Sequence, residues 1–174
     1  MKWFAALWLL CAGVGISYSI VRERKYRIVQ LEQMADTLKK LAYYMYQWKM
    51  PLKEALEHTY KEEQSWLQEF YTALIQEVKI RTKEDFGTVW LEESKQFLEK
   101  QHALTGISKE IRDIWQESFL HIPMQPEALW HSLIQKAEKI MLYKKTLQET
   151  YKQEQRLVFT MGFFVSAFLC LIFW

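Results

Sequence analysis

Both ends of the chain are free of charged side chains, and this feature constrains the fold more than any other. No Asp, Glu, Lys or Arg occurs in residues 3–21 or in residues 157–174. A helix needs about 20 predominantly apolar residues to cross the roughly 30 Å hydrocarbon core of a bilayer. We therefore predict transmembrane helices over residues 3–21 and 157–174, with one cytoplasmic helical-bundle domain over residues 22–156.

Basic residues indicate on which side of the membrane the domain lies. They flank the inner ends of both predicted spans and are Arg22, Arg24, Lys25, Arg27 and Arg156. Lys and Arg beside a span are retained in the cytoplasm, whereas Trp is enriched at membrane interfaces. We therefore expect Trp3 and Trp174 at the opposite interface. This pattern predicts a two-span protein of the cell membrane whose domain faces the cytoplasm.

The first predicted span has two other interpretations. A cleaved signal peptide would also begin with a basic residue, here Lys2, but its apolar run is usually shorter and lacks a following basic cluster. A lipoprotein signal around Cys11 requires a small residue before the cysteine, where this chain has Leu10. We favour an uncleaved span. The second cysteine, Cys170, lies in the other predicted span, so the middle domain has no thiol for a metal site.

Composition and motifs argue against most enzyme and nucleic-acid classes. The formal net charge is +2, with acidic and basic residues interspersed, whereas nucleic-acid-binding domains carry a basic face. The four histidines, His58, His102, His121 and His131, have no metal-ligand spacing. With only 5 glycines there is no phosphate loop, nucleophile elbow or dinucleotide fingerprint. We predict a non-enzyme with no cofactor, metal, nucleic acid or small-molecule substrate.

Hydrophobic periodicity between the spans is helical throughout. The apolar positions from Ile28 to Met45 follow steps of three and four, and Pro51 is expected to end this helix. Further starts are expected at Ser65 with a capping box, at Thr82 or Lys83, at the cap residue Ser108, and at Pro126, from which one helix runs into the second span. We predict an all-α fold, an antiparallel bundle of about six helices between an N-terminal and a C-terminal transmembrane helix.

Four large aromatic residues, Tyr43, Tyr44, Tyr46 and Trp48, cluster before Pro51. Six consecutive helical positions cannot all face one core. A short second helix is predicted just after Pro51, with Leu52, Ala55 and Leu56 on its apolar face. Some of the aromatic residues are expected to pack against this second helix and at least one to be exposed. Because Tyr and Trp are enriched at protein interfaces, this cluster is the candidate partner-binding site.

Several short motifs resemble one known family, that of stage III sporulation protein AB. They are Gly13 in the first span, Gln30, Leu31, Leu38, Leu41 and Met45, the element Pro51, Leu52, Glu54, Ala55 and Leu56, the helix from Phe86 through Trp90 to Glu92, and Gly162 in the last span. The resemblance covers nearly the whole chain. The chain departs from the family's Leu-Gly-x-x-Asp element at residues 119–123, and Ser166 stands where a glycine is expected.

The resemblance implies a non-enzymatic platform or adaptor in the sporulation channel complex, with a domain similar to that of type II secretion inner-membrane platform proteins. It implies as partners the companion secretion ATPase, sporulation protein AA, and other channel subunits. It implies a place in the outer forespore membrane, facing the mother-cell cytoplasm. The alternatives are a generic membrane-anchored helical scaffold unrelated to sporulation and a membrane enzyme that uses surface acids.

Overall fold

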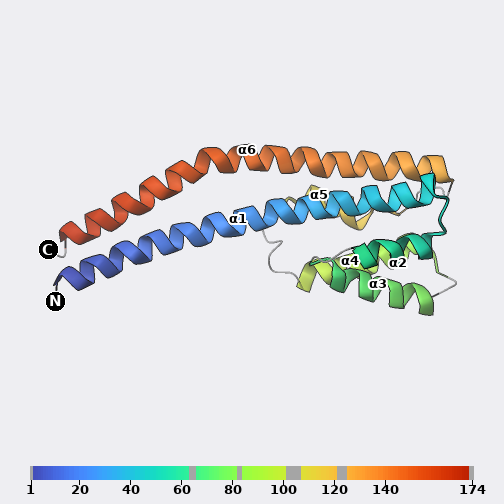
Figure 1. The fold of residues 1–174 in the computed structure, drawn as a ribbon, viewed down its shortest axis with the longest axis horizontal. Helices are drawn as coiled ribbons and strands as arrows, with labels where there is room; N and C mark the ends of the chain where they lie inside the picture. Colours follow the sequence, from blue (N-terminus) through green and yellow to red (C-terminus); the bar gives the residue numbers. More distant parts are fainter. Residues whose placement is uncertain (1, 63–65, 82–83, 101–106, 121–124, 173–174) are drawn as a thin grey trace. The chain divides into compact units, whose positions relative to one another are not determined.

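The computed structural model describes the backbone of residues 2–62, 66–81, 84–100, 107–120 and 125–172. Side chains are described for the same residues except 2–14, 16–17, 156, 158–159, 162–163, 166–167 and 169–172. This part of the chain is all-helical, which confirms the all-α part of the predicted fold class (Figure 1). Its six helices are α1 (Lys2–Gln47), α2 (Leu52–Glu62), α3 (Gln68–Ile80), α4 (Phe86–Lys100), α5 (Lys109–Gln116) and α6 (Pro126–Ile172).

The chain divides into two compact units, and the two long helices contribute to both. One unit consists of residues 1–28 and 145–174, and the other of residues 29–144. In the second unit, consecutive helices reverse direction, as predicted for an antiparallel bundle (Figure 1). Helix α3 packs against both α2 and α4, and α4 also packs against α5.

Membrane spans were predicted at both ends of the chain. Among the residues that the structure describes, no helix is sufficiently long and apolar to cross a membrane. The spans over residues 3–21 and 157–174 therefore stay predictions. The side chains of Trp3, Arg156 and Trp174, on which part of the orientation argument rests, lie outside the described residues.

The core of the 29–144 unit forms around α1. Leu31, Met34, Leu38 and Leu41 are completely buried, as their spacing of three and four predicts for one face of a helix. Helix α6 adds a second buried seam of Leu129, Leu133, Ala137 and Ile140. Burying one Leu or Met side chain contributes about 1.5–3 kcal/mol, so these two seams are a large part of the stability of the unit.

A second part of the core is aromatic. Trp90 of α4 lies with its ring centroid 5.0 Å from those of Phe70 and Trp115 and 4.7 Å from that of Phe119. Its indole Nε1–H donates a hydrogen bond of 2.9 Å to the main-chain oxygen of Trp115. These contacts join α3, α4 and α5, and the hydrogen bond satisfies a polar group that is buried with the ring.

Several predicted helix boundaries are confirmed. Helix α1 ends at Gln47, four residues before Pro51, and α6 is one continuous helix from Pro126 to Ile172. Ser108 is the N-cap of α5, since its side chain accepts a hydrogen bond of 3.4 Å from the main-chain N–H of Ile111. Proline and an N-cap serine act through local backbone geometry, which explains why the sequence predicts these positions well.

Two predicted helix starts are too early. Helix α3 begins at Gln68, and its N-cap is Leu67 without a side-chain cap, while the predicted cap Ser65 lies outside the described residues. Trp66, just before the helix, stacks on Phe97 with centroids 5.1 Å apart. Helix α4 begins at Phe86 because the Asp85 carbonyl accepts the first helical hydrogen bonds. Thr82 and Lys83 lie outside the described residues.

Gly87, in the first turn of α4, permits a close approach of two backbone segments. A Cβ atom at this position would lie 2.5 Å from the main-chain oxygen of Phe119 and 2.9 Å from Oδ2 of Asp85. The Phe119 oxygen belongs to the backbone and cannot rotate away. A glycine is therefore required for Phe86 and Trp90 to reach Phe119, whose ring lies 4.9 Å from that of Phe86.

We predict that Gly87→Ala lowers the free energy of unfolding by about 1–3 kcal/mol, the usual cost of overpacking a core. The measurement is denaturant-induced unfolding of the detergent-solubilised chain, followed by circular dichroism. Gly15→Ala is the matched control, because a Cβ there meets nothing within 4 Å. Equal stability of the two variants would show that α4 does not pack this closely against Phe119.

Candidate functional site

The structure separates the four aromatic residues predicted as a partner site. Tyr44 is buried, whereas Tyr43 and Trp48 are 44% and 52% exposed. These three rings contact one another, with centroid distances of 5.3–5.9 Å, and His58 of α2 completes the group, 4.7 Å from the Tyr44 ring. We call Tyr43, Tyr44, Trp48 and His58 the aromatic corner. In the aromatic corner, the exposed rings of Tyr43 and Trp48 pack against the buried ring of Tyr44.

Tyr46 lies elsewhere. Its ring stacks on that of Trp130 in α6, with centroids 5.2 Å apart and an interplanar angle of 29°. Tyr46 is two positions after Tyr44, and residues two apart on a helix do not face the same direction. The predicted cluster is thus brought together at three of its four positions, and the fourth packs between α1 and α6.

A charged group supports the aromatic corner from α2. The Tyr44 hydroxyl donates a hydrogen bond of 2.7 Å to Oε2 of Glu62. The same carboxylate lies 3.8 Å from Nζ of Lys40, and its other oxygen lies 3.5 Å from Nδ1 of His58. Burial, followed by the hydrogen bond and the charge of Glu62, raises the pKa of Tyr44 to about 12. The phenol is therefore a neutral hydrogen-bond donor throughout the physiological pH range.

The connection between α1 and α2 fixes the position of Trp48. Lys49 adopts a left-handed conformation, with φ of 50°, which is common just after a helix C-terminus. The Met50 N–H donates a hydrogen bond of 3.1 Å to the carbonyl of Tyr44. The chain then reverses into α2 at Pro51. This turn brings His58 and Glu62 back beside the end of α1.

An open groove of about 890 Å³ lies beside the same connection. Its apolar lining includes Met45, Met50, Leu52 and Leu129, and Lys49 and Glu127 lie at its polar parts. Methionine side chains adapt to partners of different shape. The groove and the aromatic corner together give this end of the 29–144 unit an exposed apolar and aromatic surface.

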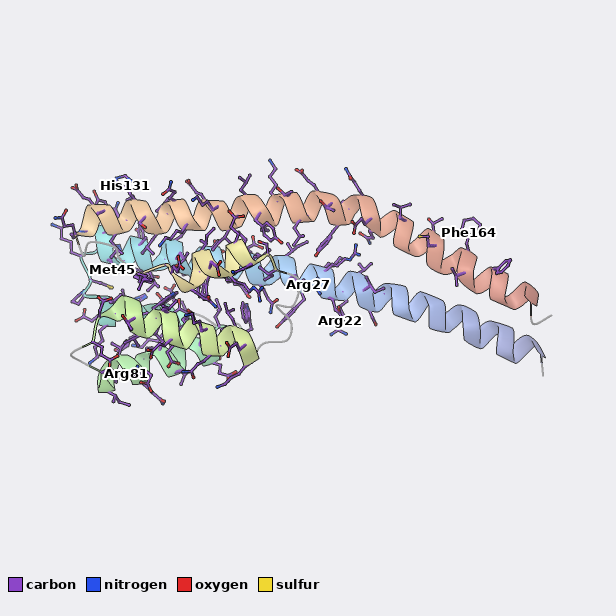
Figure 2. All side chains as sticks on the ribbon, turned by 180° about the vertical axis from the view of Figure 1, so that it is seen from behind. Arg22, Arg27, Met45, Arg81, His131 and Phe164 are labelled. Atoms are coloured by element: carbon purple, nitrogen blue, oxygen red, sulfur yellow. The ribbon has the colours of Figure 1, made fainter. Side chains whose placement is uncertain are left out.

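The basic flank of the first predicted span lies in the other unit. Arg24 forms an ion pair of 2.6 Å with Glu154, and its guanidinium lies 4.9 Å from the centroid of the Tyr151 ring. Arg27 lies 4.0 Å from Glu23. Arg22 is exposed on the side of α1 away from α6, as Figure 2 shows. The structure therefore places these cations around α1 and does not gather them at one point.

The structure adds residues that the sequence did not single out. Glu62 and Lys40 are 22 positions apart and meet only because α2 folds back on α1. The His58 and Glu62 spacing of four was the one local signal, since such residues are neighbours on a helix. In the described part of the chain, no three His, Cys, Asp or Glu residues are arranged to hold a metal ion. His102 and His121 lie outside the described residues.

These features define an all-helical protein built on two long helices, with an aromatic contact surface where the first of them ends. The chain belongs to the family of stage III sporulation protein AB, which it matches over residues 2–174. This match confirms the resemblance predicted from its short motifs and supports a role in sporulation. No curated protein and no solved structure matches the chain.

We predict that Tyr44→Phe lowers the free energy of unfolding by about 1 kcal/mol, the contribution of one buried hydrogen bond. Tyr43→Phe is the control, with an expected change below about 0.5 kcal/mol because its ring is exposed. The folded-state pKa of Tyr44, about 12, exceeds the ordinary value of about 10. Its contribution is therefore complete below pH 10 and is lost as the pH rises through 12. Equal unfolding curves for both variants at neutral pH would contradict the Tyr44 and Glu62 bond.

Proposed function

We propose that the chain is a non-enzymatic membrane platform, or adaptor, in a sporulation channel complex. It would connect a cytoplasmic secretion ATPase to membrane channel subunits during endospore formation. The family membership supports the sporulation setting. The observation that carries the adaptor role is the aromatic corner, where Tyr43 and Trp48 stay exposed although their rings are fixed by packing.

An exposed apolar stripe on α6 supports membrane attachment. Five large apolar side chains between 58% and 66% exposed lie along this helix, namely Leu157, Met161, Phe164, Val165 and Phe168. Their spacing places them on one face, and Figure 2 shows Phe164 pointing outward. Contiguous exposed apolar side chains mark membrane or protein contacts. Together with the basic flanks, the stripe supports a cell-membrane protein with a cytoplasmic domain. The proposed location at the outer forespore membrane, on the mother-cell side, rests on the family alone.

The orientation has a direct test with cysteine labelling. In growing cells that carry in their cell membrane a chain whose Cys11 and Cys170 are replaced by Ala, we expect Lys109→Cys to react with a membrane-impermeant maleimide only after lysis. Lys109 is exposed at the start of α5, so accessibility to the reagent is limited by the membrane alone. Lys2→Cys is the matched control and is expected to react in intact cells. Labelling of Lys109→Cys in intact cells would contradict a cytoplasmic domain.

The aromatic corner has the properties of an interface anchor. Tyr and Trp supply much of the binding energy at protein interfaces, above all where neighbouring groups exclude water from them. Here Tyr44 and His58 support the two exposed rings from below. We propose that the companion ATPase binds this surface and that the channel subunits contact the membrane-proximal part of the protein.

We expect the double variant Tyr43→Ala, Trp48→Ala to reduce recovery of the ATPase in a pull-down by at least about thirtyfold, since two anchor residues cost about 2 kcal/mol or more. The matched control is Val29→Ala, Ile80→Ala, which also truncates two exposed apolar residues. Both variants should retain the helical content of the natural chain, measured by circular dichroism. Undiminished recovery with the first variant, or equal losses with both, would refute this assignment.

The two alternative functions, a membrane enzyme and a scaffold unrelated to sporulation, predict different observations. A membrane enzyme needs a carboxyl group with a raised pKa in a cleft. Burial, and then repulsion from Glu77, raises the pKa of Glu93. Glu93, however, adjoins a salt-bridge cluster in which Arg81 binds Glu77 at 2.8 Å and Glu92 at 2.6 Å. This setting favours a structural role.

A scaffold unrelated to sporulation would be made at equal levels in growing and starved cells, whereas the proposed adaptor accumulates only in starved cells.

A further inference from the structure

A small pocket between α1 and α6 in the unit of residues 1–28 and 145–174 has the chemistry of an anion site. Its volume is about 170 Å³, and it is lined by Val21, Arg24, Lys25 and Ile28 from α1 and by Gln148, Tyr151, Lys152 and Gln155 from α6. Three of these eight side chains are cationic and none is acidic. We propose that this pocket binds the phosphate headgroup of an anionic membrane lipid. The proposal rests on the membrane attachment proposed above.

The cationic side chains of the pocket are positioned to bind a phosphate. Arg24 is fixed from two directions, by its 2.6 Å ion pair with Glu154 and by the face of the Tyr151 ring. A guanidinium has five N–H donors, and the Glu154 bond occupies one of its nitrogens. Lys25 and Lys152 are exposed and form no ion pair with a side chain that the structure describes. With Glu154 included, the local charge is about +2, which an anionic ligand would balance.

The rest of the lining matches a lipid better than a free ion. Val21 is buried, and Ile28 lies on the same side of α1 two turns later, so the cations lie between apolar walls. Gln148 and Gln155 offer amide donors to phosphate or glycerol oxygens. Exposed apolar side chains continue from the pocket toward both ends of the chain, with Tyr18 at 62% and Leu157 at 61% exposed. A phospholipid has the same succession of phosphate, glycerol and acyl chain.

The position of the pocket agrees with this ligand. Its cations belong to the inner flanks of the two predicted spans, where the protein would meet the headgroups of the cytoplasmic leaflet. That leaflet carries anionic lipids, and basic pockets between helices at this level bind their headgroups. Arg22 does not line the pocket and is exposed on the other side of α1 (Figure 2). It therefore serves as a control for charge alone.

The test is native mass spectrometry of the full-length chain released from detergent, with phosphatidylglycerol titrated against phosphatidylcholine. We expect one phosphatidylglycerol to be retained by the natural chain and no phosphatidylcholine. Lys25→Gln, Lys152→Gln should weaken this binding about thirtyfold, because each lysine near an anionic lipid contributes about fivefold. Arg22→Gln, Lys145→Gln removes the same charge from the same helices outside the pocket and should leave binding unchanged.

Three outcomes would overturn the lipid assignment. Equal binding by both double variants, or equal retention of both lipids, would show that no specific site exists. Inorganic phosphate that displaces phosphatidylglycerol at equal concentration would show a free-anion site. Alkaline carbonate extraction separates this proposal from the membrane proposal, since the pocket variant should stay in the membrane pellet. A natural chain that is extracted by carbonate would refute membrane attachment itself.

Discussion

The burial of one segment of α1 on more than one side is the constraint on which the 29–144 unit depends. Leu31, Ala35, Leu38 and Ala42 are at most 1% exposed, and Gln30 and Thr37, on an adjoining line of the helix, are also completely buried. So broad a buried arc exceeds the stripe that one neighbouring helix covers. Other helices must therefore enclose α1, and the antiparallel order of the short helices satisfies that requirement with short connections.

The same constraint produces the aromatic corner. Tyr44 lies two turns after Thr37 and continues its buried line, so the neighbouring Tyr43 is turned outward. Trp48 lies just beyond the end of α1 at Gln47 and is also exposed. The same buried line of α1 also lowers the stability of the fold, because it contains polar side chains. The side-chain polar atoms of Gln30 and the hydroxyl of Thr37 have no hydrogen-bond partner among the described residues. Each such group costs about 1–3 kcal/mol, whereas the Tyr44 phenol avoids this cost through Glu62.

The sequence predicted what depends on local chemistry. The helical period, the end of α1 before Pro51, the cap at Ser108 and the continuous α6 from Pro126 all follow from spacing or from one residue's backbone preference. The features it missed depend on contacts between distant segments. Trp66 stacks on Phe97, Glu62 meets Lys40 only in the folded chain, and Gly87 is required by the backbone of Phe119. The four clustered aromatics showed the same limit, since periodicity predicted an exposed member without revealing that Tyr46 stacks on Trp130.

The proposed adaptor uses two surfaces of α1, the pocket lined by Arg24 and Lys25 for lipid and the aromatic corner for a protein partner. Photo-crosslinking in sporulating cells tests the second claim most directly, with a photoreactive amino acid in place of Trp48 or, as the control, of the exposed Ile80. The account predicts that position 48 captures the secretion ATPase and that position 80 does not. Capture of the ATPase from position 80 alone would contradict it.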